Sequence, residues 1–303
     1  MRPRIAIPMP HSLNPEYAQR SIPQYERAVT LAGGEPVRIP LDQSVAVVTK
    51  MIESCDGVLL PGSSADVDPE RFHAKRSLHT AAPDPRRDAV DDLLLADAYK
   101  LRKPVLGICY GLQSLNVFHK GSLIQHIPDF LPAETRAKVN HEAGKDVAVA
   151  HTVEIEPGSK LAEIALPASE ATTFTEKDSS IAAPEAPRHQ KAVSSANGLA
   201  ALSKIPTSRA KSAREMGHPD ILSNHGKLVL PVNSSHHQSA DAIGDGLRIV
   251  ARCPADGIIE GLEGTDPDHF VVAVQWHPER SIDADEASRA IFRALIEKAS
   301  VSG

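Results

Sequence analysis

The chain has 303 residues, with 33 Lys or Arg against 39 Asp or Glu, so its formal net charge is −6. This mild acidity argues against a nucleic-acid-binding protein, whose surface carries a basic stripe or face. No stretch approaches the roughly 18 to 20 consecutive apolar residues of a membrane helix, and prolines interrupt the N-terminus before a signal-peptide apolar region forms. We therefore expect a cytoplasmic protein without nucleic-acid or membrane partners.

The first part of the chain alternates between short apolar strands and segments with apolar residues at helical spacing. The predicted strands are residues 4–9, 35–40, 57–60 and 104–108, and the predicted helices are residues 15–32, 43–54, 84–101 and 112–118. Repeated strand–helix alternation predicts an α/β fold, with a parallel sheet covered by helices on both faces and joined by right-handed crossovers.

The second part of the chain has a different pattern. Predicted strands at residues 122–127, 151–155, 228–233, 247–253, 257–262 and 270–276 follow one another mostly with short turns, which indicates an antiparallel extension of the same sheet. A closing helix is expected over residues 283–299, with Asp283 as its N-cap. We expect one domain over residues 1–303.

Residues 168–224 fit neither the strand nor the helix period. They are rich in Ala, Ser, Pro, Glu and Lys, and we interpret them as a flexible insertion, with a short helix near residues 208–216.

The segment Gly107-Ile108-Cys109-Tyr110-Gly111 joins a predicted strand to a predicted helix. It resembles a nucleophile elbow with Cys in place of Ser, in which the glycines permit a tight turn that exposes the side chain. A helix N-terminus behind the sulfur favours the reactive thiolate. The alternative is a small buried cysteine between two packing glycines, and the five residues alone leave both open.

Two further segments end predicted strands at the same edge of the sheet. His277 follows an apolar strand and has Glu279 two residues later, so the carboxylate can orient the imidazole as a catalytic base. The loop that starts at Pro61-Gly62-Ser63 can turn backbone N–H groups toward a neighbouring oxyanion. An ordinary surface histidine and an ordinary turn are the alternatives. Together with Cys109 these residues predict a thiol nucleophile, base and orienting acid.

The remaining cysteines and histidines indicate no metal site. Cys55, Cys109 and Cys253 are too widely spaced for a disulfide framework or a zinc C-x-x-C pair. Four histidines near the insertion lack standard ligand spacing, and we expect neither a metal nor a cofactor; they are His218, His225, His236 and His237.

Taken together, the motifs resemble the class I glutamine amidotransferase superfamily, most closely its peptidase C26 branch, which includes γ-glutamyl-γ-aminobutyrate hydrolase. The resemblance covers residues 3–167 and 226–298, and its pieces occur in the family's order: the loop 61–69, Arg87-Asp88, the Cys109 elbow with Gln113, residues 121–125, residues 232–238 and Trp276-His277-Pro278-Glu279. It implies a flavodoxin-like, doubly wound, mostly parallel sheet with an antiparallel extension.

The resemblance also implies the roles of individual residues. Cys109 would attack the γ-carbonyl of a small γ-glutamyl substrate, His277 would relay the proton and Glu279 would orient His277. The backbone N–H groups of Tyr110 and of Gly62 or Ser63 would hold the oxyanion. The glutamyl end of the substrate would be contacted by Gln113 and the segment around His236, His237 and Gln238. The expected products are a free amine and glutamate, by way of a γ-glutamyl thioester.

Two other functions stay open. Tyr110 stands where the hydrolase branch often has Arg and is similar to the glutaminase part of GMP synthetase, so a glutaminase subunit supplying ammonia to a separate synthetase is one alternative. A non-catalytic binding protein on the same fold is the other. The sequence names neither the released amine nor a synthetase partner, and it leaves homo-oligomerisation open.

Overall fold

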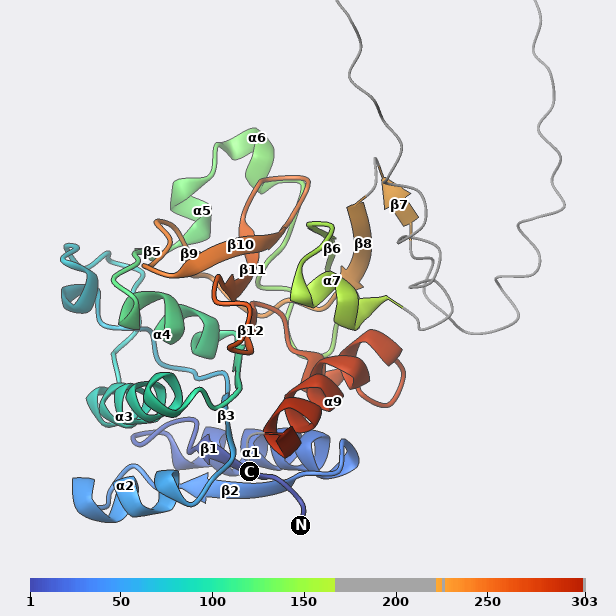
Figure 1. The fold of residues 1–303 in the computed structure, drawn as a ribbon. Helices are drawn as coiled ribbons and strands as arrows, with labels where there is room; N and C mark the ends of the chain where they lie inside the picture. The colour runs from blue at the N-terminus through green and yellow to red at the C-terminus, as the bar shows by residue number, and fades with distance from the viewer. Residues whose placement is uncertain (167–221, 225–226, 302–303) are drawn as a thin grey trace, which may run out of the picture.

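The computed structural model describes residues 1–166, 222–224 and 227–301 (Figure 1). Its strands are β1 (Arg4–Pro8), β2 (Glu35–Ile39), β3 (Gly57–Leu60), β4 (Val105–Ile108), β5 (Leu123–Ile124), β6 (His151–Ile155), β7 (Leu222–Asn224), β8 (Lys227–Val232), β9 (Ser239–Ala240), β10 (Leu247–Arg252), β11 (Ile259–Gly264) and β12 (Val271–Val274). Its α-helices are α1 (Pro15–Leu31), α2 (Val45–Glu53), α3 (Pro85–Leu101), α4 (Tyr110–Phe118), α5 (Ile127–Phe130), α6 (Ala133–Arg136), α7 (Lys160–Ala165) and α9 (Glu286–Val301), and the 3-10 helices are η1 (Pro69–Phe72) and η2 (Pro278–Arg280). Among these helices none is long and apolar enough to span a bilayer.

Ten strands form one sheet in the order β2-β1-β3-β4-β12-β11-β10-β6-β8-β7. The five strands from β2 to β12 run parallel, and every pair from β12 to β7 is antiparallel. The predicted α/β fold, with a parallel sheet and an antiparallel extension of that same sheet, is confirmed.

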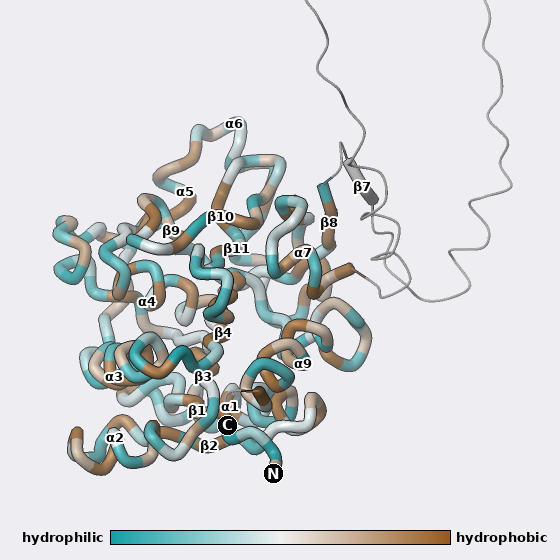
Figure 2. Tube along the Cα trace, in the orientation of Figure 1, coloured by the Kyte–Doolittle hydropathy of each residue, from teal (hydrophilic) through white to brown (hydrophobic). Residues whose placement is uncertain are grey.

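Alternating residues along the parallel strands face two separate cores. Ile5 and Ile7 of β1 pack on the side of α1 and α9, whereas Ala6 packs on the side of α2, α3 and α4. This alternation follows from the strand pleat, which directs successive side chains to opposite faces. In Figure 2 hydrophobic and hydrophilic residues alternate along the helices, as expected for helices that cover a sheet with one face.

The structure corrects two local predictions and adds a helix that was not predicted. The strand expected at residues 122–127 is only Leu123–Ile124 and pairs with β9 in a separate two-stranded sheet, because α5 begins at Ile127 and Pro128 lacks the N–H of a ladder. The closing helix begins at Glu286 rather than Asp283, and Asp285 accepts a hydrogen bond from the Ser288 amide at 2.8 Å as its cap. Helix α7, which was not predicted, follows Ser159 as N-cap.

The predicted insertion is described only at its end. Residues 222–224 form β7, which pairs with β8 and extends the sheet, so this part of the segment is not irregular. The short helix expected near residues 208–216, and the rest of residues 168–221, lie outside the described residues.

Candidate active site

Strand β4 ends at Ile108, directly before Cys109, and helix α4 begins at Tyr110, two residues earlier than predicted. Cys109 has φ 54° and ψ −106°, a backbone conformation that residues other than glycine rarely adopt. Such strain persists only where the surrounding structure fixes it, and it is frequent at active sites. Here it turns the chain sharply from strand to helix, with the Cys109 side chain on a cavity wall.

Two glycines make this turn possible because neither position has room for a side chain. A Cβ added at Gly111 would overlap the carbonyl oxygen of Leu60 in β3. A Cβ added at Gly107 would lie 2.9 Å from the Gly111 carbonyl oxygen. The first turn of α4 therefore packs against the sheet backbone, which explains the Gly-x-Cys-x-Gly spacing.

His277 lies beside Cys109 because β12 is the parallel neighbour of β4. Val274 pairs with Ile108, and the Cys109 amide donates to the Val274 carbonyl at 2.8 Å. The His277 ring is hydrogen-bonded to Cys109, and its Nδ1 lies 2.7 Å from Glu279 Oε1. Since His277 and Glu279 are only 2% and 4% exposed, thiol, imidazole and carboxylate form one buried row.

The charges in this row reinforce one another. Burial alone would lower the pKa of His277, but the charges of Glu279 and Cys109 and hydrogen bonds to both outweigh it and raise this pKa to about 9. Burial alone would raise the pKa of Glu279, but the charge and hydrogen bond of His277, with the charge of Arg280, lower it. At neutral pH the carboxylate is thus ionised and the imidazole holds a proton.

The loop after β3 brings Gly62 and Ser63 to the same place. A Cβ added at Gly62 would lie 3.0 Å from His277 Cε1 and 3.6 Å from Cys109 Cβ, so the loop backbone contacts both side chains. The Gly62 amide donates to Tyr25 Oη at 3.0 Å, whereas Ser63 lines the cavity beside Cys109. Two amides of this loop were considered for the oxyanion. Because the Gly62 amide already donates to Tyr25, the Ser63 amide is the better candidate.

Tyr110 presents its backbone rather than its ring to the site. As the first residue of α4, its N–H belongs to the four amides that have no acceptor within a helix. Its ring is buried, with Oη donating to Asp88 Oδ1 at 2.5 Å and the Arg87 guanidinium 4.9 Å from the ring centre.

Arg87 supports the site from behind. It is fully buried, pairs with Asp91 at 2.7 Å, and donates to the carbonyl oxygens of Pro10 and Pro61 at 3.1 and 2.7 Å. It thereby fixes the loop that carries Gly62. No local pattern predicts this role, because an Arg and an Asp four residues apart on a helix ordinarily form a solvated surface pair.

Asn233 was also missed as a supporting residue, although it lies in a segment that carries the family resemblance. Its Oδ1 accepts from the His277 amide at 3.0 Å, and its Nδ2 donates to the His277 carbonyl at 2.9 Å and to Ser281 Oγ at 3.0 Å. Because both backbone groups of His277 are bound, Asn233 fixes where the imidazole stands.

A cavity of about 620 Å³ opens onto Cys109 and His277. Four basic side chains line it, against three acidic ones: Arg20, Arg27, Lys145 and Arg280, against Asp146, Glu279 and Asp283. Arg27 pairs with Asp283 at 2.7 Å, and Glu279 is bound to His277. The Nε of Arg280 lies 3.6 Å from Glu279 Oε1, and its Nη1 is buried with no hydrogen-bond partner among the described residues, so the guanidinium can still bind a further anionic group.

Gln113 and the segment around His236, His237 and Gln238, predicted to contact the substrate, are not among the described residues that line the cavity. Gln113 donates to the Gln238 carbonyl at 3.2 Å, His237 pairs with an aspartate of the loop after β3, and His236 lies in a cluster of buried histidines. The part of the cavity wall that the structure describes includes none of them, although Ser235 lines it. Their contact with the substrate stays a prediction, and the cavity points to other side chains.

Metal-ligating side chains gather away from the thiol. In the described part of the chain, the groups of His, Cys, Asp and Glu whose donor atoms converge include neither Cys109 nor His277. One group contains His236, but its neighbours come from distant parts of the sequence. Of the four histidines considered from the sequence, His218 and His225 lie outside the described residues.

Known proteins resemble this chain over most of its length. The sequence profile of the Peptidase C26 family matches residues 9–211 and 215–279. A glutamine amidotransferase-like protein of Rickettsia prowazekii is 30% identical over 93% of this chain and 89% of its own length. The γ-glutamyl-γ-aminobutyrate hydrolase of Escherichia coli is 26% identical over 90% of this chain and 84% of its own. A crystal structure of a GMP synthase subunit from Thermoplasma acidophilum has the same fold, with a TM-score of 0.55 at 12% identity over 99% of this chain and 96% of its own.

Proposed function

The chain belongs to the peptidase C26 family, in the class I glutamine amidotransferase superfamily, and we propose that it hydrolyses the γ-amide bond of γ-glutamyl amines. The observation that carries the proposal is the buried row of Cys109, His277 and Glu279 at the wall of a cavity with an unpartnered arginine nitrogen. A thiol in contact with an oriented imidazole is the arrangement of a covalent acyl-transfer site.

In the proposed reaction the Cys109 sulfur attacks the γ-carbonyl carbon and forms the C–S bond. The carbonyl oxygen takes the negative charge and accepts hydrogen bonds from the amides of Tyr110 and Ser63. His277 then gives its proton to the leaving nitrogen as the C–N bond breaks, which leaves a γ-glutamyl thioester and a free amine.

In the second half of the reaction water attacks the thioester carbonyl. His277, now neutral, takes a proton from that water, and the C–S bond breaks to release glutamate and return the thiolate. Glu279 stays ionised throughout and acts through the orientation and charge of His277.

Arg280 is proposed to bind the α-carboxylate of the glutamyl group. It follows Glu279 directly, lines the cavity, and has a buried guanidinium nitrogen without a hydrogen-bond partner in the described structure. A guanidinium nitrogen left unbound in a buried place is costly unless an acceptor arrives, and a carboxylate is the acceptor whose geometry matches it.

The proposal is tested with the purified chain alone. Glutamine and a series of γ-glutamyl amines, whose amine parts are neutral, anionic or cationic, are each assayed for released glutamate. We expect at least one γ-glutamyl amine to be hydrolysed faster than glutamine, with the activity lost in Cys109→Ala. If glutamate is released from glutamine but from none of the γ-glutamyl amines, and only after a synthetase is added, the ammonia-supplying alternative is established. No Cys109-dependent release from any substrate would contradict the proposal.

A further inference from the structure

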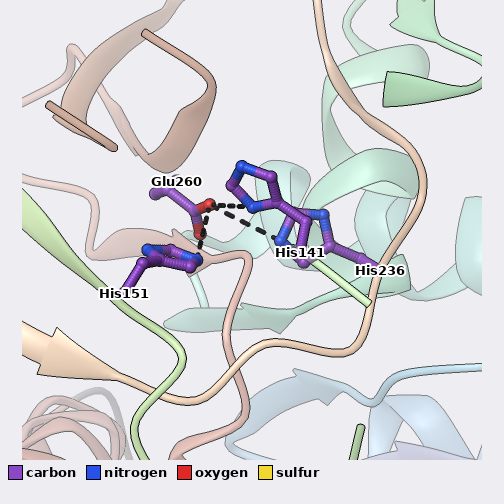
Figure 3. Close-up of side chains that lie close together, drawn as sticks. All are labelled: His141, His151, His236 and Glu260. Carbon is purple, nitrogen blue, oxygen red and sulfur yellow. Dashed lines mark ion pairs between the residues drawn. The ribbon is translucent and has the colours of Figure 1, made fainter. Parts of the chain in front are cut away.

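Three histidines and one glutamate meet inside the antiparallel part of the molecule (Figure 3). His151 begins β6, Glu260 lies in β11, His141 precedes β6, and His236 lies between β8 and β9. Their side chains are only 0 to 4% exposed. In Figure 3 the three imidazole rings surround the Glu260 carboxylate.

Apart from the ion pairs that the three imidazoles form with Glu260, the atoms that face one another in this cluster have no hydrogen-bond partner in the described structure. These atoms are His141 Nδ1, His151 Nε2, His236 Nε2 and both carboxylate oxygens of Glu260. Buried polar atoms are normally hydrogen-bonded, since leaving one unsatisfied costs about 1–3 kcal/mol and more when it is charged. One such atom from each of the four residues, all within 4.8 Å of one another, indicates a group that binds them together.

The opposite nitrogen of each ring is bound to an oxygen. His141 Nε2 lies 2.8 Å from Asp256 Oδ2, His236 Nδ1 lies 2.9 Å from the Gln238 carbonyl, and His151 Nδ1 lies 3.2 Å from its neighbour's carbonyl. A carbonyl oxygen only accepts, so the nitrogens bound to carbonyls carry the hydrogen and their partners in the ring present lone pairs. This outer arrangement, carboxylate or carbonyl behind imidazole, orients histidines that ligate metals.

The distances suit a small divalent ion. Glu260 Oε1 lies 3.2 Å from His141 Nδ1, 3.5 Å from His151 Nε2 and 3.5 Å from His236 Nε2, and all donor atoms lie within 4.8 Å of one another. Ligands about 2.0–2.1 Å from a tetrahedral zinc ion are separated by about 3.3 Å. The 3.2 Å distance of His141 is at the upper limit of a direct nitrogen-to-oxygen hydrogen bond, about 2.7–3.2 Å, and the two 3.5 Å distances lie beyond it.

We propose that His141, His151, His236 and Glu260 bind one zinc-class divalent ion. Three imidazoles and one carboxylate complete a four-coordinate set, which is the form of a structural rather than a catalytic zinc site. Neutral imidazole donors favour zinc and its transition-metal neighbours over magnesium or calcium.

The ion would fix the loop that supports the active site. It would join His236 in that loop to β6 and β11, and the same loop contains Asn233, which binds the His277 backbone. The Gln275 amide also donates to the Glu260 carbonyl at 2.8 Å, two residues before His277. The site is therefore assigned a structural role next to the proposed catalytic one, and it does not depend on which substrate is cleaved.

The test begins with the metal content of the protein. The chain is purified without an affinity tag of histidines, stripped with a chelator, and titrated with zinc chloride. We expect one zinc per chain and a rise in Tm on its addition. Glu260→Gln and His151→Gln should abolish this binding, and Asp256→Asn should weaken it by about 10- to 100-fold. His79→Ala, which alters a histidine of an exposed group, should bind zinc like the wild type.

A second measurement uses cobalt chloride with the wild-type chain, so its result does not depend on whether a variant folds. The wild-type chain loaded with Co²⁺ should show the intense visible bands of tetrahedral coordination without thiolate charge transfer. His141 also belongs to a second group of possible ligands, with Cys253 and Asp256. The variant Cys253→Ala tells whether the ion binds to that group instead of the proposed one. Loss of the ion in Cys253→Ala, thiolate charge transfer, or a wild-type chain that binds no zinc would each overturn the proposal.

Discussion

The three cysteines of the chain have very different surroundings. Burial raises the pKa of the Cys55 thiol, and it raises the pKa of Cys253 to about 12, so both thiols stay protonated at neutral pH. Cys109 instead is the N-cap residue of α4 and is hydrogen-bonded to His277. The thiolate is the reactive form of cysteine, and only Cys109 has the surroundings that use it.

Replacement of these cysteines one at a time tests that difference. Cys109→Ala should lower kcat/KM by at least about a thousandfold with the fold retained, because the covalent route is lost. Cys55→Ala and Cys253→Ala are the matched controls and should keep activity within a fewfold. Wild-type turnover by a verified Cys109→Ala preparation would show that Cys109 is not the nucleophile.

Glu279 sets the pH range of His277. Among the contributions to this pKa, burial lowers it most and the Glu279 charge raises it most, with a net value of about 9. Because the proton on His277 goes to the leaving amine, kcat/KM should fall as the pH rises through about 9. Glu279→Gln removes the negative charge, so its alkaline limb should move to lower pH.

The size of the loss separates orientation from proton transfer. Glu279→Gln keeps an acceptor oxygen and should cost about tenfold to a hundredfold in kcat/KM, well short of His277→Ala, which removes the proton shuttle. The two variants are compared over pH on one γ-glutamyl amide. Equal losses, or an alkaline limb that does not move in Glu279→Gln, would rule out the orienting role.

Arg280 offers a test of substrate orientation. If it binds the α-carboxylate, Arg280→Ala should raise KM by about 10- to 100-fold, as expected when a hydrogen bond to a charged group is lost. A substrate whose α-carboxylate is replaced by a carboxamide should show little difference between the two enzymes. Arg27→Ala, which removes an exposed cavity arginine paired with Asp283, is the control. The same loss with both substrates would refute the carboxylate contact.

At the scale of elements, the two strand ends at the active site depend on a segment from the antiparallel half. Asn233 follows β8 and holds both backbone groups of His277. Asn233→Ala would leave a buried N–H and a buried carbonyl unsatisfied, at about 1–3 kcal/mol each, and would release the imidazole. We expect a lower Tm and a larger fall in kcat than in substrate affinity.

Ser281→Ala is the matched control for Asn233→Ala, because it removes only the third partner of the asparagine side chain. It should leave kcat near that of the wild type. A kcat for Asn233→Ala that equals the wild-type value, in spite of a lowered Tm, would show that the asparagine stabilises the fold without positioning His277.

The elements that could be predicted from the sequence are those with a strong local signal. Strand–helix alternation and the apolar run around Val105 indicated the parallel half, because buried parallel strands are continuous apolar segments. The apolar run around Val271 predicted a strand, but it was assigned to the antiparallel extension, whereas β12 pairs in parallel with β4. Strand β5 was overestimated because apolar residues continue past Ile124 to Ile127, where the structure begins the short helix α5. Helix α7 was missed because six residues are too short for a helical period to show.

The candidate site was predictable only in part. Cys109 directly follows β4, and His277 and Glu279 follow its parallel neighbour β12, so the topology alone brings them to one edge of the sheet. The buried surroundings of Arg87, the unpartnered nitrogen of Arg280 and the meeting of His141, His151 and His236 with Glu260 have no such local pattern. These arrangements depend on contacts between segments far apart in the chain, such as His141 and Glu260, and a single sequence does not show such contacts.

For the whole molecule, the described cavity wall, with four basic against three acidic side chains, contrasts with the net charge of −6. An acidic protein that gathers basic side chains at one cavity concentrates positive potential where an anionic glutamyl group would bind. The parallel half supplies Cys109 and the oxyanion amides, and the antiparallel half supplies Asn233 and the buried histidine cluster. The proposed reaction therefore needs the whole sheet and is expected from this chain alone.

The central claim, that Cys109 carries the glutamyl group, is tested most directly by rapid acid quench of the purified chain during turnover of a γ-glutamyl amine, followed by mass spectrometry. The proposed mechanism predicts a mass increase of one glutamyl group, confined to the peptide that contains Cys109 and absent from Cys109→Ala. Turnover that continues with no such adduct at any time, with release of the amine and glutamate always simultaneous in the pre-steady state, would contradict it.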